Sequence, residues 1–144
     1  MPSASDLAPT LVDRVVEQVG AFRGVVVEPH RFGGRAFRLG SREIGHVHAN
    51  GFVDVNFPRP LRDALVEAGR TGPHHRYPDS GWTTFHLSGP ADVPAAVDLL
   101  RVSYLFHAAA LSKRNRSIPA PDLEADLAAL GVPEAVHAAF APVV

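Results

Sequence analysis

The sequence predicts an α+β fold in which helices cover one face of an antiparallel sheet of about four to five strands. Several short strand patterns follow one another directly, separated by turn sequences such as GSR and NG. Helical patterns flank this run and do not alternate with each strand, as a doubly wound parallel sheet would require. The length of 144 residues is typical of one domain with a single core.

The first half of the chain contains one helix and then a run of strands. Apolar residues at helical spacing, among them Leu11, Val15 and Val19, predict a helix over residues 7–19. The segments GVVVEPH, RAFRLG, REIGHVHA and FVDVNF follow, rich in β-branched or aromatic residues and separated by turns. They predict an antiparallel meander of three or four strands.

The second half of the chain contains a helix, a strand and a longer helix, followed by a helical tail. Pro60 suits the first turn of a helix that ends at Gly69. The segment GWTTFHL predicts a strand, and a long helix begins near Asp92. We assign residues 1–111 to a single α+β domain. Residues 112–144 form a linker and a short helical tail, which packs on this domain or on a partner.

Composition narrows the classes of function. A formal net charge of −1 gives no general attraction to nucleic acid or to an anionic membrane. The absence of cysteine excludes disulfides and thiolate metal ligands. The N-terminal residues do not resemble a secretory signal, and the apolar stretches are too short to span a bilayer. We therefore expect a cytoplasmic protein with no membrane or nucleic-acid partner.

Two histidines, His46 and His48, alternate in a predicted strand and therefore point to the same face of the sheet. One interpretation is a metal site, with Asp54, His75 or His86 as a third ligand. Simple exposure to solvent is a second. We expect the third, in which the pair lines a pocket for an organic ligand. Accordingly we predict no metal, with His46 and His48 as the residues that would bind one.

A corner suited to anions is predicted where the last strand of the meander meets the next helix. Asp54 lies near the strand end, and Arg59 and Arg62 lie at the helix start. The free N–H groups and the dipole of a helix N-terminus favour negative charge. A guanidinium can also bind a carboxylate or enolate through two hydrogen bonds. An ion pair of Arg62 with a neighbouring carboxylate is the simpler alternative.

The segment GPHHRYPDSGW joins that helix to the next strand. Its prolines stiffen the chain, and Asp79 and Ser80 belong to a typical turn. The adjacent His74 and His75 need another explanation, because histidine can accept a proton near neutral pH. Trp82 is either a core residue or the wall of a pocket.

As a composite, these motifs resemble the luciferase-domain family, which comprises small bacterial proteins and the luciferases of bioluminescent fungi. The resemblance covers about residues 25–110. It rests on H-x-H-A, an aspartate, F-P-R, R-D-x-L-V, G-R, P-H-H, P-x-S-G-W and L-L-R-x-S-Y. The ending SGWTTFHL…DLLRVSYLF is similar to that of MmcQ/YjbR-type proteins, whose double-wing α+β fold agrees with the predicted element order.

For the fungal luciferases the resemblance implies oxygenation of a hydroxylated pyrone without flavin or metal, with release of carbon dioxide and light. Such a reaction needs a base, a cation that holds the enolate and a dry aromatic pocket. Carried onto this chain, the resemblance assigns His48 or His75 as the base, Arg62 or Arg59 as the cation and Trp82 as the wall. Luminescence itself is not expected here.

These observations predict a protein that binds a small, planar, anionic organic molecule and acts on it as a cofactor-independent oxygenase, a class of oxidoreductase. The catalytic residues would be His48, His75 and Arg62. The expected ligand-binding residues are His46, Asp54, Arg59, His74, Asp79, Ser80 and Trp82. The competing hypothesis is a non-catalytic regulatory module that contacts protein or DNA through the tail and the Lys113–Arg116 run. A homodimer is compatible with either hypothesis.

Overall fold

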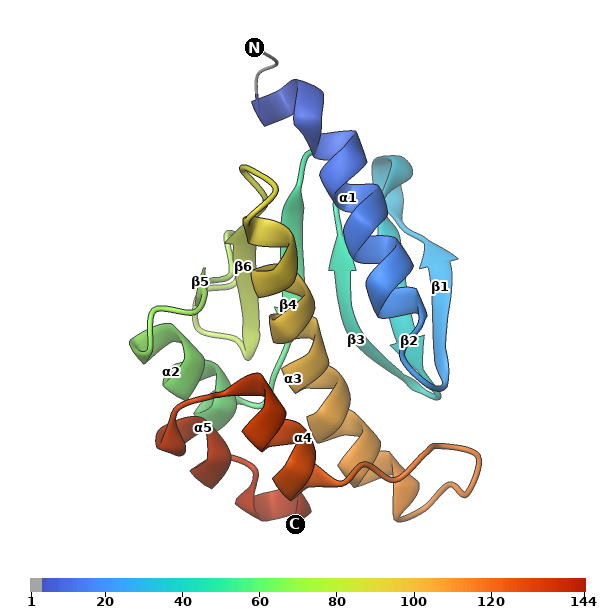
Figure 1. Cartoon of the computed structure of the whole chain (residues 1–144), viewed down its shortest axis with the longest axis vertical. Coiled ribbons are helices and arrows are strands. Elements are labelled where there is room, and N and C mark those ends of the chain that lie inside the picture. Colours follow the sequence, from blue (N-terminus) through green and yellow to red (C-terminus); the bar gives the residue numbers. More distant parts are fainter. Residues whose placement is uncertain (1–3) are drawn as a thin grey trace.

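Six antiparallel strands form one layer of the structure, with helices packed in front of it (Figure 1). The computed structural model describes residues 4–144, with side chains from residue 10 onward. The sheet has the strand order β1-β2-β3-β4-β6-β5. Its strands are β1 (Val25–Pro29), β2 (Arg35–Leu39), β3 (Arg42–Val47), β4 (Phe52–Asn56), β5 (Gly72–Pro73) and β6 (Trp82–His86).

Five α-helices accompany the sheet within residues 4–144, which confirms the predicted α+β class. They are α1 (Ala4–Gly20), α2 (Arg59–Glu67), α3 (Asp92–Ser112), α4 (Leu123–Leu130) and α5 (Glu134–Ala138), with short 3₁₀ turns η1 (Arg31–Gly33) and η2 (Ala141–Val143). The sheet has six strands, slightly more than predicted. The additional β5 is only two residues long, too short to produce a periodic pattern.

Helices α1 and α3 lie across one face of the sheet (Figure 1). That face carries the apolar side of each central strand, including Val47, Val53 and Val55, which are fully buried. Leu100 of α3 and Val15 of α1 belong to the same core. Since side chains alternate along a strand, the remaining residues of β3, β4 and β6 point to the opposite face. We call this opposite side the open face.

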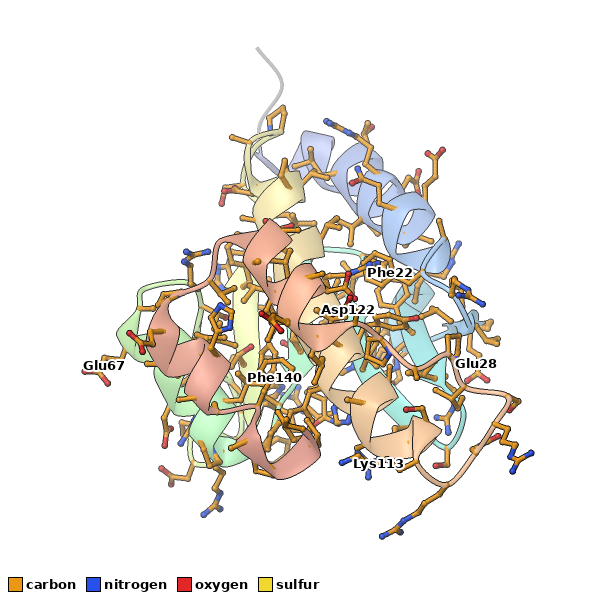
Figure 2. All side chains as sticks on the ribbon, turned by 60° about the horizontal axis from the view of Figure 1, so that its bottom comes forward. Phe22, Glu28, Glu67, Lys113, Asp122 and Phe140 are labelled. Atoms are coloured by element: carbon orange, nitrogen blue, oxygen red, sulfur yellow. The ribbon has the colours of Figure 1, made fainter. Side chains whose placement is uncertain are left out.

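The C-terminal tail packs on the domain, one of the two arrangements that the sequence left open. Helix α4 contacts α3, and α5 contacts α2. Phe140 is buried, and its ring lies 5.6 Å from that of Phe106 on α3. Figure 2 shows Phe140 toward the middle of the molecule, whereas Glu67 points outward. The tail therefore completes the core on the helical side and leaves the open face to other segments.

None of the helices within the described residues is both long and apolar enough to cross a membrane.

Candidate functional site: a histidine cluster around Asp54

A row of polar side chains crosses the middle of the open face. His46 of β3 pairs with Asp54 of β4, and Asp54 pairs with Thr84 of β6. Because the three residues are in register on adjacent strands, their side chains lie on the same face and close together. Asp54 is only 1% exposed. A carboxylate is therefore buried at the centre of the sheet, where it needs polar partners.

Four histidines and a threonine supply these partners. Thr84 Oγ1 donates a hydrogen bond of 2.7 Å to Asp54 Oδ1. The other oxygen, Oδ2, lies 2.8 Å from His48 Nε2 and 3.0 Å from His46 Nε2. The Nε2 atoms of His74 and His75 are each 3.3 Å from the same oxygen. Four imidazoles thus converge on one carboxylate oxygen. We call Asp54 with these four residues the histidine cluster.

The loop between β5 and β6 is held against this cluster by its own backbone. The N–H groups of Arg76 and Tyr77 both donate to His74 Nδ1, at 3.1 Å. A neutral His74 must therefore carry its hydrogen on Nε2, the atom that faces Asp54. The backbone N–H of His75 donates to Thr84 Oγ1, at 3.2 Å. This hydroxyl consequently fixes both the carboxylate and the loop.

A second carboxylate, that of Glu43, contacts His46 on the side away from Asp54. His46 Nδ1 lies 3.1 Å from Glu43 Oε2, so the imidazole bridges Glu43 and Asp54. Residues three apart in a regular strand point to opposite faces. A register shift opposite Phe37 and Arg38 places an additional residue, Ile44, between the paired positions of β3. This bulge rotates Glu43 to the side on which His46 lies.

The charges of the cluster follow from these contacts. Burial alone would lower the pKa of His46, but its hydrogen bonds with Asp54 and Glu43 outweigh burial and raise the pKa to about 9. Burial would raise the pKa of Asp54, yet the hydrogen bonds from His46, Thr84 and His48 hold it well below its usual range. Burial lowers the pKa of His74 despite the attraction of Asp54. At neutral pH an imidazolium and a carboxylate therefore coexist beside a neutral imidazole.

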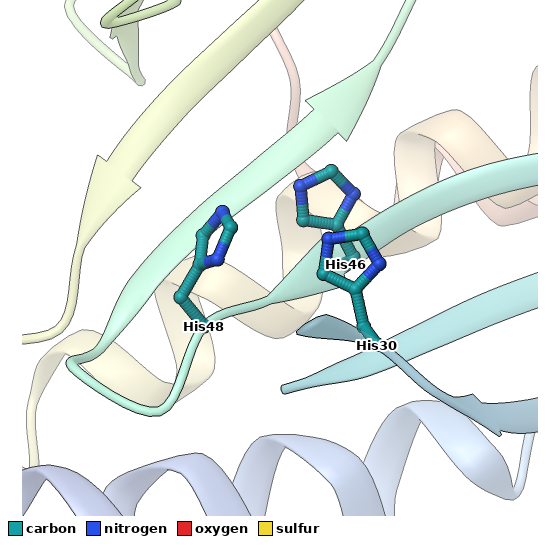
Figure 3. Close-up of side chains that lie close together, drawn as sticks. All are labelled: His30, His46 and His48. Atoms are coloured by element: carbon teal, nitrogen blue, oxygen red, sulfur yellow. The ribbon is translucent and has the colours of Figure 1, made fainter. Parts of the chain in front are cut away.

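A pocket of about 410 Å³ opens in front of the cluster. Asp54 and its four histidines form the base, together with His30, whose ring stacks on His46 at 4.1 Å. Figure 3 shows His30, His46 and His48 close together, with His46 and His48 from the end of β3 and His30 from the segment after β1. Cationic, amide and aromatic side chains complete the wall: Arg31, Phe32, Asn50, Phe52, Arg76 and Tyr77.

Two exposed aromatic side chains flank the pocket. Phe32 in η1 is 94% exposed, and Tyr77 in the β5–β6 loop is 64% exposed. Phe32 also has a φ of 54°, a left-handed conformation that is strained for a bulky residue. The backbone thus holds an apolar ring in solvent at the rim of a polar pocket. Strain of this kind is common where a side chain contacts a ligand.

Trp82 packs behind the histidines. Its ring lies 5.3 Å from that of His46 and 6.4 Å from that of His74, with the planes tilted or edge-on. The indole is partly buried and is not among the residues that line the pocket. In the structure it supports the imidazole rings.

The two arginines singled out from the sequence lie outside the pocket. Arg62 Nε is 2.7 Å from Asp63 Oδ1, and Arg62 Nη1 donates to the carbonyl oxygen of Pro78, at 2.6 Å. Arg62 lines a separate groove beside α2. Arg59 is exposed at the helix start. The ion pair with a neighbouring carboxylate, the simpler alternative, is the one formed, and Arg31 and Arg76 are the arginines near the histidines.

Asp79 and Ser80 are part of the turn before β6. Ser80 Oγ donates to the carbonyl oxygen of Tyr77, at 2.7 Å, and accepts a hydrogen bond from the N–H of Trp82, at 3.2 Å. Asp79 is exposed and lies outside the pocket wall. Both residues shape the loop that carries His74 and His75.

Fold and site together describe an α+β domain with a buried carboxylate, ringed by histidines, at the base of an open pocket. Within this domain, residues 41–103 match the family model described as Luciferase domain. The match confirms the resemblance inferred from the sequence motifs, and it includes all five residues of the histidine cluster. His30 and Phe32 precede the matched segment. Searches of curated proteins and of solved structures found no match.

Proposed function

We propose that the pocket in front of the histidine cluster binds a small, planar organic anion, and that the protein acts on it as an oxygenase of enolic or pyrone-type compounds. The observation that carries the proposal is the combination of cations and aromatic rings around a buried carboxylate. Arg31 and Arg76 line the pocket from two different loops. Their positions favour an anion, because a guanidinium binds carboxylates and enolates through paired hydrogen bonds.

The dimensions and the apolar part of the wall favour a flat ligand. A volume of about 410 Å³ is within the usual range for small-molecule pockets. Phe52 lies in the wall and Phe32 and Tyr77 at the rim, so that aromatic surfaces surround the polar groups. A planar conjugated ring can stack on such surfaces while its oxygen atoms face the cations.

Oxygenation of an enolic compound by dioxygen begins with removal of the enolic proton. We assign this step to His75, whose side chain is 33% exposed and is the most accessible in the cluster. Its Nε2 faces Asp54, which leaves Nδ1 as the atom that can accept a proton from a ligand. Asp54 would orient this imidazole much as a carboxylate orients histidine in hydrolytic triads. The Luciferase domain match supports this reaction class.

A hydroxypyrone is a suitable probe. We expect saturable binding by calorimetry, a loss of at least tenfold in affinity for the Arg31→Ala/Arg76→Ala double variant, and dioxygen uptake that disappears in His75→Ala. Arg114→Ala and His137→Ala are matched controls, since both residues are exposed and lie outside the pocket wall. Binding that is equal in the pocket and control variants would contradict the proposal.

A further inference from the structure

We propose that a divalent transition-metal ion binds beside His48 on the open face of the sheet, with ligands from the two groups that share this histidine: His30 with His46, and Asp54 with His75. This proposal goes beyond the binding of an organic anion and does not depend on it. It rests on the spacing of the potential ligand atoms, on the contacts that orient them and on the number of nitrogen atoms around one oxygen.

The spacing within these groups is close to that of a coordination shell. His48 Nε2 and His46 Nε2 lie 2.8 and 3.0 Å from Asp54 Oδ2. With metal–ligand bonds of about 2.0–2.1 Å, neighbouring ligands are separated by roughly 2.9–3.4 Å, depending on the geometry. Further ligands are available on both sides. His30 forms a group with His46 and His48, and His75 forms one with His48 and Asp54, in which all ligand atoms lie within 4.8 Å of one another.

Figure 3 shows how three of these imidazoles approach one another. His46 comes from within β3, His48 from just after it and His30 from the segment that follows β1. The rings of His46 and His48 are edge-on at 4.9 Å, so they do not stack and their nitrogen atoms remain accessible. The sheet therefore brings potential ligands from the end of β3 and from the segment after β1 close together.

Outer contacts orient the ligand atoms as metal sites require. Histidine ligands usually donate their second N–H to a carboxylate, and Glu43 accepts such a contact from His46 Nδ1, at 3.1 Å. This leaves the lone pair of His46 on Nε2, toward Asp54. Thr84 engages Asp54 Oδ1 at 2.7 Å, so that Oδ2 is the oxygen available to a metal. The same reasoning excludes His74, because its Nδ1 accepts two backbone N–H groups and its Nε2 must keep a hydrogen.

Hydrogen bonding alone does not account for the cluster. A carboxylate oxygen has about two lone pairs, yet four imidazole nitrogens lie within 3.3 Å of Asp54 Oδ2. Asp54 is buried, and Glu43 adds a second negative charge behind His46. Buried charges are normally paired or coordinate metals. A divalent cation would supply the positive charge that these two carboxylates otherwise take from a protonated imidazole.

The ligand types indicate which ions would bind. Imidazoles with a single carboxylate favour zinc, iron, cobalt, nickel or copper over calcium and magnesium, which require mostly oxygen ligands. Either group of three ligands occupies only part of a coordination shell, so that positions remain open toward the pocket. The proposed site is therefore of the open type, suited to an exchangeable water or organic ligand.

Metal binding to the untagged full-length chain tests the proposal. Protein treated with a chelator is titrated with Zn²⁺ in a calorimeter and with Co²⁺ in a spectrophotometer, where coordination by nitrogen produces visible absorption. We expect about one equivalent of tightly bound ion, with affinity reduced at least tenfold in His48→Ala and in Asp54→Asn. Glu43→Gln should also weaken binding by roughly tenfold or more, because it removes the partner that orients His46. His137→Ala should bind as the wild type does.

Substoichiometric binding by the wild type, or unchanged affinity in both His48→Ala and Glu43→Gln, would overturn the proposal. Glu43 is at the edge of the cluster, so its variant remains informative if Asp54→Asn does not fold. Titration of the hydroxypyrone into metal-free protein separates this proposal from the proposed function. Pyrone binding without any metal binding refutes only the metal site, and metal binding without any pyrone binding refutes only the organic-anion site.

Discussion

Two histidines with little exposure, His107 and His46, lie on opposite sides of the sheet, and their pKa values are shifted in opposite directions. His107 of α3 is 6% exposed, and its Nδ1 accepts from Arg42 while its Nε2 donates to the carbonyl oxygen of Asn56. Burial, with the nearby Arg42 charge, lowers its pKa to about 4 against the opposing hydrogen bond to Asn56. His46 on the open face is bonded to two carboxylates, and its pKa is raised to about 9.

The difference separates a structural histidine from a potentially functional one. A single neutral tautomer of His107 satisfies both of its neighbours, so nothing in its surroundings calls for another ligand. The histidine cluster has the reverse character, because its nitrogens outnumber the lone pairs of the oxygen that they surround. Polar groups whose hydrogen bonds are all made are typical of a core. Potential ligand atoms in excess of their hydrogen-bond partners, at the base of a pocket, are typical of a binding site.

The largest loss of stability is expected from removing the Asp54 carboxylate at the centre of the histidine cluster. Asp54→Ala leaves a protonated His46 without its main buried counter-charge. Breaking a buried ion pair from one side typically costs about 3–5 kcal/mol. We expect a decrease of about that size in the free energy of unfolding at neutral pH, measured by urea denaturation. A loss below about 1 kcal/mol would show that the cluster does not depend on this charge.

The next largest effect is a loss of stability in acid that depends on His107. Its pKa is about 4 in the folded protein, below the ordinary value of 6.5, so the unfolded chain binds more protons between these values. Stability is therefore complete above about pH 6.5 and decreases as the pH falls toward 4, by roughly 3 kcal/mol in total. Arg42 faces the ring and adds to this penalty. His107→Gln should remove this component from urea unfolding curves, and an unchanged acid slope would contradict it.

A third test uses two adjacent threonines on opposite faces of β6. Thr84→Val removes the hydroxyl that bonds Asp54 and the loop, at an expected cost of about 1–3 kcal/mol. Thr83 is fully buried on the helical side, and its hydroxyl has no hydrogen-bond partner within the described residues. Thr83→Val should therefore be neutral or stabilising. If urea denaturation shows the same loss of unfolding free energy in both variants, the hydroxyl on the open face is no more important for stability than the one on the helical face.

The smallest effect concerns the strained rim of the pocket. Phe32→Gly relieves a left-handed φ of 54° at a side chain that is almost fully exposed. The gain is partly offset by the greater freedom of glycine in the unfolded chain, so we expect stabilisation of roughly 0.5 kcal/mol. Hydroxypyrone affinity should decrease in the same variant. Improved thermal stability without any loss of affinity would argue against a role for this ring in binding.

The fold was largely predictable, because its signals are local. Turn sequences such as GSR and NG mark the meander, and the apolar spacing of the flanking helices agrees with the helices observed. Alternation along β3 placed His46 and His48 on one face. By contrast, β5 is only two residues long and produces no pattern.

The individual contacts of the site were predictable only between residues that are also neighbours in the sequence. The contact between Thr84 and Asp54 requires knowing that β6 pairs with β4. Glu43 reaches His46 only because a bulge breaks the alternation of β3. His30 follows β1, and its stacking on His46 across β2 was not indicated by its position in the sequence. Conversely, Arg62 had suitable chemistry at a helix start but lies at another surface.

The most direct test of the functional assignment to the open face is a side-chain ¹H–¹⁵N spectrum that resolves the eight histidines of the untagged protein. Zn²⁺ and the hydroxypyrone are added in separate titrations. We expect saturable shifts of His46 and His48 with the metal and of His75 with the pyrone, while His107 and His137 remain unchanged. If the open-face histidines are unaffected by both additions, or respond no more than His107 and His137, the histidine cluster is not a binding site.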